Sequence, residues 1–150
     1  MQSLMQSLMQ SLMQSLMRSL AALALAAVLM TALGAPAARS DEAADRETCF
    51  KSSGDKAIAA CTRRIASLTG KTDKNSRHNL AVVHYSRGYE FLAKKDDKRA
   101  LADFEVSWKT DPSYTQALYA RGLAKKRLGD EKAGDADMAQ AKKIDPKLGK

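Results

Sequence analysis

The 150-residue chain has little aromatic, proline, cysteine or histidine content. Phe, Trp and Tyr together make up 5% of it, and there are three Pro, two Cys and two His. Val and Ile are too few to build the core of a β-sheet. Ala, Leu, Lys and Arg, which favour helices, are abundant instead. The composition therefore predicts an all-α protein.

Charge is almost missing from the beginning of the chain. All 17 Asp and Glu lie from Asp41 onward, and Arg18 is the one basic residue before Arg39. The whole chain nevertheless carries a formal net charge of +8. The first 37 residues and the remainder are thus chemically different segments.

The uncharged segment has the parts of a secretory signal peptide. Arg18 precedes an apolar run over residues 20–35, and Ala35-Pro36-Ala37 supplies the small side chains that a signal peptidase site requires. We predict a cleavable signal peptide over residues 1–37, cut after Ala37 or Ala38, and export of the remainder, to the periplasm in a bacterial cell. No stable membrane span is expected after cleavage. The alternative is an uncleaved anchor, since the run reaches about 20 apolar residues when preceding residues are counted.

Four identical MQSL tetrads open the chain, and a fifth, MRSL, begins at Met17. A period of four drifts against the 3.6-residue helical period, and residues 1–17 carry no charge for the flanking positions of a coiled coil. Residues 17–37 already form a complete signal peptide. We therefore interpret residues 1–16 as a tandem expansion of the leader, or as the product of a start codon assigned upstream of the true initiator codon at Met17.

A fainter repeat of 34 residues occupies the C-terminal half. The coinciding residues are Tyr85 and Tyr119, Arg87-Gly88 and Arg121-Gly122, Asp96 and Asp130, Lys98 and Lys132, Ala102-Asp103 and Ala136-Asp137, and Asp111-Pro112 and Asp145-Pro146. Apolar residues at three- and four-residue steps predict two helices in each copy, over 81–94 and 98–109, then over 115–128 and 132–144. Gly88 and Gly122 lie within helices, where glycine costs about 1 kcal/mol, and this predicts a close helix–helix approach.

This pattern resembles the tetratricopeptide repeat (TPR) family, and the chain as a whole resembles a small exported TPR protein of bacterial type. The resemblance rests on the period, on Gly88, Gly122 and Ala100, and on the closing Asp-Pro pairs. It implies antiparallel helix pairs stacked as a short solenoid, with repeats at 79–114 and 115–148. The chain departs from the family pattern at three positions. His84 stands where Trp is common, Lys125 where Tyr is favoured and Gly134 where Ala is favoured, and we expect the last repeat to form a polar cap.

A degenerate helix pair is predicted to precede the two repeats, over residues 38–78. Its helices would span 43–51 and about 57–68, with a turn at 53–55 and a polar connection at 70–76. Three pairs are the practical minimum for a stable stack. In this register Cys61 occupies the core position of Phe104 and Met138.

The two cysteines are expected to form one disulfide. Cys49 and Cys61 lie on the two helices of the degenerate pair, and an oxidising compartment lets such a bond persist. Two buried free thiols are the alternative. A metal site is not indicated, because there is no Cys-x-x-Cys spacing and the histidines are distant in sequence.

No catalytic constellation is found in the sequence. His78, near a predicted loop, and His84, on a predicted helix, have no evident Ser or Cys partner, and no glycine-rich phosphate loop is present. The paired acids Asp96-Asp97 and Asp130-Glu131 fall at turns, where they are expected to cap helices. We therefore predict neither an enzyme nor a cofactor.

The family resemblance implies a concave groove lined by the first helix of each pair. The residues on the matching faces are Tyr85, Tyr89, Leu92, Tyr119, Leu123, Lys126 and Arg127. Such a groove binds an extended peptide or a helix. Some of the tyrosines could instead pack between helix pairs. The Asn residues of the family's peptide-carboxylate clamp are missing, and we therefore do not expect this chain to recognise a peptide carboxylate in that way.

These observations predict an exported scaffold that binds a protein or peptide and has no catalytic activity. The alternative is a basic, envelope-associated protein that contacts anionic lipid or polymer through its excess positive charge. Nucleic acid is not expected in that compartment. Pairing with a second copy to form a homodimer is left open.

Overall fold

A computed structural model describes residues 5–6, 9–10, 13–14 and 35–150 in two compact units, residues 1–40 and 41–150. In the first unit the described residues are helical, and Met5, Met9 and Met13 are exposed. The apolar run predicted as the core of the signal peptide lies almost entirely outside the described residues. Within the described ranges, no helix is both long and apolar enough to span a membrane.

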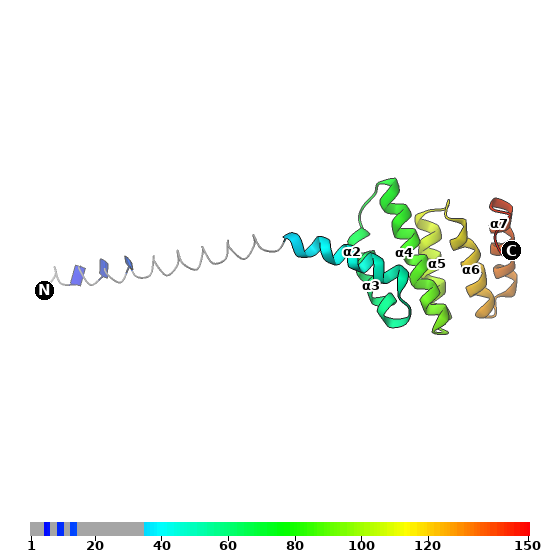
Figure 1. The fold of residues 1–150 in the computed structure, drawn as a ribbon, viewed down its shortest axis with the longest axis horizontal. Coiled ribbons are helices and arrows are strands. Elements are labelled where there is room, and N and C mark those ends of the chain that lie inside the picture. Colours follow the sequence, from blue (N-terminus) through cyan, green and yellow to red (C-terminus); the bar gives the residue numbers. More distant parts are fainter. Residues whose placement is uncertain (1–4, 7–8, 11–12, 15–34) are drawn as a thin grey trace. The chain divides into compact units, whose positions relative to one another are not determined.

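The prediction of an all-α fold is confirmed for residues 35–150, which form helices and contain no strand. The helices are α2 (Ala35–Lys51), α3 (Gly54–Leu68), α4 (Lys74–Ala93), α5 (Asp97–Thr110), α6 (Thr115–Arg127) and α7 (Glu131–Ile144). From α3 onward each helix packs against the next, and Figure 1 shows them side by side in chain order. The arrangement is repeat-like, because α4–α5 and α6–α7 are successive helix pairs of similar form.

Three helices begin earlier than the sequence predicted. α2 begins at Ala35 instead of residue 43, and α3 begins at Gly54, within the predicted turn. α4 begins at Lys74 instead of residue 81, so the end of the predicted polar connection is helical. Asp73 explains this start, because its carboxylate accepts a hydrogen bond of 2.9 Å from the Ser76 N–H and caps the helix.

The turn within each pair is built the same way twice. Asp96 and Asp130 cap α5 and α7 by accepting the N–H groups of Arg99 and Ala133, as predicted. The preceding residues, Lys95 and Gly129, adopt left-handed backbone conformations with φ of 61° and 93°. These conformations let the chain reverse within three residues, so the two helices of a pair lie next to each other.

Two clusters of buried side chains form the core. One joins α4, α5 and α6 through Phe91, Leu92, Ala100, Phe104, Ala120 and Ala124. The other joins α2, α3 and α4 through Cys49, Ala60, Cys61, Leu68 and Val83. The predicted close approaches are present. A Cβ on Gly88 would lie 2.7 Å from a ring carbon of Phe104, and a Cβ on Gly122 would lie 2.6 Å from the Gly134 carbonyl oxygen.

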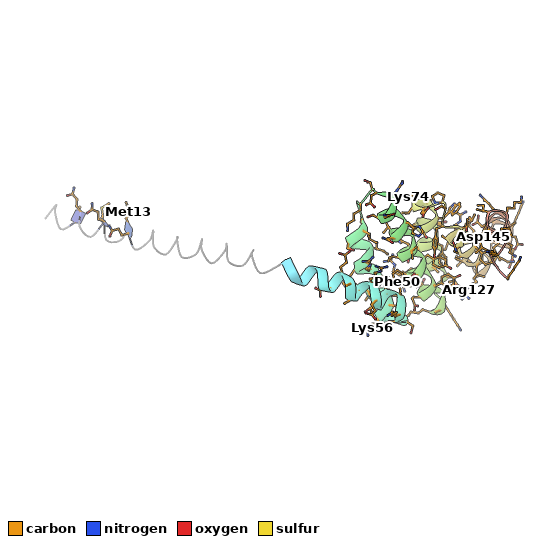
Figure 2. The ribbon with its side chains drawn as sticks, turned by 45° about the horizontal axis from the view of Figure 1, so that its top comes forward. Met13, Phe50, Lys56, Lys74, Arg127 and Asp145 are labelled. Carbon is orange, nitrogen blue, oxygen red and sulfur yellow. A yellow bond between two sulfur atoms is a disulfide. The ribbon has the colours of Figure 1, made fainter. Side chains whose placement is uncertain are left out.

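The predicted disulfide between Cys49 and Cys61 is present, with a Cα–Cα distance of 4.8 Å. It joins α2 to α3, and Cys61 is fully buried at the core position predicted for it. The side chains of this end of the molecule, with Phe50 and Lys56 labelled, are drawn in Figure 2. The disulfide therefore fixes the last turn of α2 against the helices that follow.

Candidate binding surface

Aromatic residues gather on one face of α4. Tyr85 and Tyr89 are one helical turn apart, and their ring centroids lie 4.8 Å apart in an edge-to-face arrangement. Tyr85 also contacts Tyr114 at 5.1 Å and the buried Phe104 at 5.8 Å. The ring of Tyr85 thus lies partly in the interface between the repeats, whereas Tyr89 remains 39% exposed. Tyr85 therefore packs between the repeats, as the packing alternative expects, whereas the role of the exposed Tyr89 in a groove stays a prediction.

A cavity of about 290 Å³ lies between the end of α2 and α4. It is lined by Cys49, Phe50, Ser52, Tyr85, Ser86, Tyr89 and Glu90. Phe50 is 43% exposed, so two aromatic rings face this cavity while still in contact with solvent. Two of the lining residues are held in place by contacts with α3. Cys49 is bonded to Cys61, and the Glu90 carboxylate accepts the Gly54 N–H at 2.6 Å.

Burial strengthens the preference of two tyrosine hydroxyls in this region for the neutral form. Burial is the main cause that raises the pKa of Tyr85 far above its usual value, and a hydrogen bond with Tyr89 adds to it. Burial also raises the pKa of Tyr114 to about 12. A neutral phenol can donate a hydrogen bond, to another side chain or to a bound partner.

The remaining predicted groove residues are placed differently. Leu92 is buried in the core, and Leu123 packs against the same core cluster. Tyr119 is covered on one side by the C-terminal segment, because a Cβ on Gly149 would lie 2.6 Å from its hydroxyl oxygen. The ammonium of Lys142 lies 5.8 Å from the centre of the Tyr119 ring.

The two predicted basic groove residues form ion pairs within the chain. Lys126 lies 2.7 Å from Asp135 and 3.2 Å from Glu131 on α7. Arg127 lies 2.7 Å from Asp97 on α5. The α4 part of the predicted groove therefore combines with Phe50 into one open aromatic surface, whereas the α6 part is engaged in contacts of its own.

Phe50, Ser52, Ser86 and Glu90 were not predicted from the sequence. The signal for Phe50 was its position directly after Cys49. A disulfide there fixes the neighbouring side chain, and a large apolar residue at the end of a polar helix has little core to enter. Ser86 and Glu90 gave no signal of their own, apart from lying one residue along the helix from Tyr85 and Tyr89.

The histidines are held by carboxylates. His84 is buried on α4, and its Nδ1 lies 2.9 Å from Asp103, which also accepts two hydrogen bonds from Arg87. Burial disfavours the charged form of Asp103, but the bonds from Arg87 and His84 outweigh it and lower the pKa of Asp103. His78 lies on α4 and not in a loop, with its Nδ1 2.6 Å from Asp111. Among the residues described, no three His, Cys, Asp or Glu side chains are grouped as metal ligands would be.

Compared with protein-family models, with curated proteins and with solved structures, the chain gives no match in any of the three. The relationship between its two repeats rests on the residues of this chain alone. Arg87 and Arg121, which are 34 positions apart, each donate a hydrogen bond to an Asp on the following helix.

Proposed function

We propose that the protein is an exported, non-catalytic scaffold of TPR type that binds a peptide segment of another protein. The binding surface would be the aromatic surface, defined as Phe50, Tyr85 and Tyr89. The observation that carries this proposal is the cavity of about 290 Å³ between α2 and α4, onto which all three side chains face.

The aromatic surface has the chemistry of a peptide-binding site. Tyr and Phe bring large apolar areas at low entropic cost, and Tyr adds a polar tip. Residues of this kind contribute most of the binding energy at protein interfaces. The cavity is of a size for one apolar side chain, and the nearby Ser52 hydroxyl suits the backbone of an extended segment. The Ser86 hydroxyl already donates to the Val82 carbonyl oxygen at 2.9 Å. A partner would remove two half-exposed aromatic rings from water.

Independent observations support the repeat class and the export. The helix pairs α4–α5 and α6–α7 share a 34-residue period and a within-pair turn, and in each pair an Arg on the first helix donates hydrogen bonds to an Asp on the second. The outer side of α7 is polar, as a terminal repeat requires. A disulfide persists in extracytoplasmic compartments. The sequence of residues 1–37 is of signal-peptide type.

The proposal is tested by selecting binders from a displayed library of random peptides and measuring their affinity by fluorescence anisotropy. Phe50→Ala and Tyr89→Ala are each expected to weaken a selected peptide by about tenfold or more, as truncation of interface aromatic residues does. Val106→Ala is the matched control. The exposed fraction of Val106, 41%, is similar to those of Phe50 and Tyr89, but Val106 lies on α5 outside the cavity.

Unchanged affinity for the control together with weakened affinity for both aromatic variants supports the proposal. Selected peptides that bind all three variants equally would contradict it. A library that yields no binder above background would also count against it.

A further inference from the structure

α4 is longer at its N-terminus than its counterpart in the next repeat. A shift of 34 residues places Ala81 on Thr115, which is the first residue of α6. Residues 74–80 of α4 therefore have no helical equivalent in α6. Core packing explains little of this extension, because Lys74, Asn75, Arg77, His78 and Asn79 are exposed. Two cations at a helix start are also unfavourable for the helix itself.

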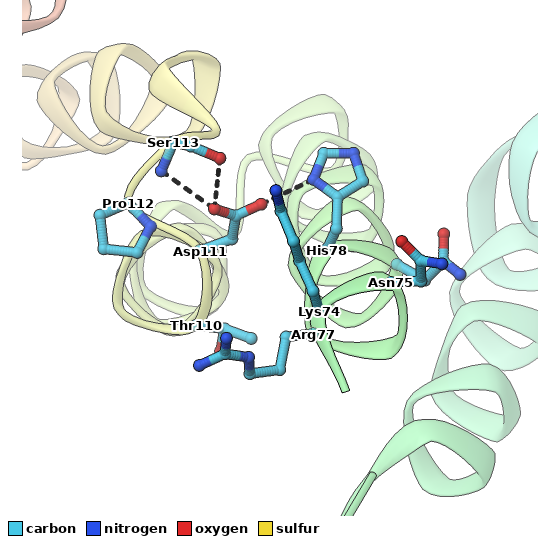
Figure 3. Close-up of a pocket in the computed structure, with 9 residues that line it drawn as sticks. Lys74, Asn75, Arg77, His78, Thr110, Asp111, Pro112 and Ser113 are labelled. Carbon is cyan, nitrogen blue, oxygen red and sulfur yellow. Dashed lines mark hydrogen bonds and ion pairs between the residues drawn. The ribbon is translucent and has the colours of Figure 1, made fainter. Parts of the chain in front are cut away.

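The extension forms one wall of the larger cavity. This cavity has a volume of about 630 Å³, within the range of small-molecule sites. It is lined by Lys74, Asn75, Arg77, His78 and Asn79 of α4 and by Thr110, Asp111, Pro112 and Ser113 at the α5–α6 connection. Figure 3 shows Lys74 and His78 of α4 beside Asp111, with Asn75 on the side of α4 that faces away from the α5–α6 connection. We call this cavity the basic pocket.

The lining of the basic pocket consists mainly of hydrogen-bond donors. Lys74 and Arg77 contribute cationic groups, Asn75 and Asn79 contribute amides, and the hydroxyl of Thr110 completes the set. Arg and Lys are the side chains that recognise phosphate groups most often.

The one carboxylate in the basic pocket is already engaged. Asp111 Oδ1 accepts the N–H and the hydroxyl of Ser113, and Oδ2 lies 2.6 Å from His78 Nδ1. The hydrogen bond from Ser113, helped by His78, lowers the pKa of Asp111, so the acid is ionised and the shared hydrogen belongs to His78. Asp111 thus keeps its negative charge, and both of its oxygens are occupied by hydrogen bonds from its neighbours.

The charge at this end of the molecule is not balanced. Here the helices α3, α5 and α7 end and α4 and α6 begin (Figure 1). The cations at this end are Lys71, Lys74, Arg77, Lys109, Lys142, Lys143 and Lys147. None of them forms an ion pair with a carboxylate in the part of the chain that the structure describes. Asp73 and Asp145, like Asp111, accept backbone N–H groups.

The opposite end differs only in part. There Lys94 pairs with Asp55 on another helix pair and Arg127 pairs with Asp97, whereas Lys56, Lys95, Lys98 and Lys132 form no ion pair in the described part of the chain. Figure 2 shows Lys74 at one end and Lys56 and Arg127 at the other. Unpaired cations therefore occur at both ends, and what distinguishes the basic pocket is that two of them, Lys74 and Arg77, line a cavity.

We propose that the basic pocket binds a phosphate group, either of a small molecule or of a lipid headgroup. A phosphate offers several acceptor oxygens and up to two negative charges, which suits the ammonium of Lys74 and the guanidinium of Arg77 on α4 together with the Thr110 hydroxyl. This site is separate from the aromatic surface and does not depend on peptide binding there.

The proposal is tested by titrating the purified protein with sodium phosphate at constant ionic strength and following backbone amide shifts by NMR. Saturable shifts are expected at residues 74–79 and at Thr110, Asp111 and Ser113. The double variant Lys74→Gln/Arg77→Gln is expected to weaken binding at least about tenfold, the scale of losing a hydrogen bond to a charged group. The matched control Lys56→Gln/Lys98→Gln loses the same charge at the opposite end and is expected to leave the affinity within about twofold, because those charges are remote and screened.

Flotation with vesicles distinguishes the two sources of phosphate. Binding to vesicles of phosphatidylcholine with phosphatidylglycerol, but not to phosphatidylcholine alone, and its loss in the Lys74/Arg77 variant, would identify a lipid headgroup. Saturable shifts with free phosphate and no vesicle binding would identify a small molecule.

Equal loss in both double variants, or shifts that neither saturate nor localise, would overturn the proposal and indicate nonspecific charge attraction. Phe50→Ala should keep phosphate binding intact. This variant makes failure of the basic pocket distinguishable from failure of the aromatic surface.

Discussion

Arg87 and Asp103 are joined by two hydrogen bonds of 2.8 Å, donated by Nε and Nη2 of the guanidinium. The same fork recurs 34 residues later, where Arg121 donates two bonds of 2.7 Å to Asp137. Each fork ties the first helix of a pair to the second. The third partner of the carboxylate differs, because His84 contacts Asp103 whereas Lys125 contacts Asp137.

The forks are expected to contribute substantially to stability. Asp103 is buried, so Asp103→Asn would leave Arg87 and His84 facing a neutral group in a site with little water. We expect the free energy of unfolding to fall by about 3 kcal/mol, as when a buried ion pair loses one partner. Urea denaturation followed by circular dichroism measures this change.

Asp135→Asn is the control for that experiment. Asp135 also pairs with a basic side chain, Lys126, but its own side chain is 65% exposed. The expected loss is below about 1 kcal/mol, as for surface ion pairs. Equal losses in the two variants would show that the fork around Asp103 is no stronger than a surface pair.

Acid should destabilise the protein through the same carboxylates. Arg87 and His84 overcome burial to lower the pKa of Asp103, and Arg121 and Lys125 do the same for Asp137, from a usual value of 3.8. A carboxyl group whose folded pKa is depressed stabilises the fold above its unfolded pKa, and this contribution is lost as the pH falls through the folded value. Stability should therefore decline from about pH 5 downward.

Urea midpoints measured between neutral pH and pH 3 test this dependence. The decline should be shallower in Asp103→Asn, which has lost one of the groups responsible. A variant whose midpoints fall as steeply as those of the parent would place the acid sensitivity elsewhere.

Much of the fold could be predicted because the chain repeats itself. The 34-residue period gave α5, α6 and α7 with small errors at their ends, whereas α4 begins well before its predicted start at residue 81. The glycines at 88 and 122 indicated the close approaches. The disulfide followed from two cysteines on neighbouring predicted helices, in a chain whose first 37 residues were predicted to be a signal peptide. These features depend on local sequence, so no long-range packing had to be known.

The forks and the aromatic surface depend on packing between helices. Arg87 and Asp103 were visible as repeated residues, yet a carboxylate on a helix can equally face water, and only the register of α4 against α5 brings the two together. Helical spacing put Tyr85, Tyr89 and Leu92 on one face, but it could not show where the core ends on that face. Leu92 proved to be inside it and Tyr89 outside.

The disulfide should carry much of the stability of the first helix pair. Breaking the bond between Cys49 and Cys61 frees a short loop, which costs about 3 kcal/mol in the chain-entropy model. We expect dithiothreitol to lower the urea midpoint and to remove amide hydrogen-exchange protection from residues 41–51 before α4–α7 are affected. Cys49→Ala/Cys61→Ala should unfold at the reduced midpoint and be insensitive to dithiothreitol. Intact mass showing two free thiols in non-reduced exported protein would contradict the bond.

The turn between α4 and α5 offers a stabilising substitution. Lys95 has a φ of 61°, a left-handed conformation that costs a side chain about 1 kcal/mol, and Gly129 serves the equivalent turn without that cost. Lys95→Gly is expected to raise the free energy of unfolding by about 0.5–1 kcal/mol, and Gly129→Lys to lower it by about 1 kcal/mol. No atom lies within 4 Å of a Cβ on Gly129, so that loss would come from the backbone conformation and not from a clash.

Lys98→Gly makes the same chemical change inside helix α5 and should be destabilising by up to about 1 kcal/mol. Urea denaturation of the three variants checks the signs, and a Lys95→Gly protein that loses stability as Lys98→Gly does would show that the strain at Lys95 is negligible.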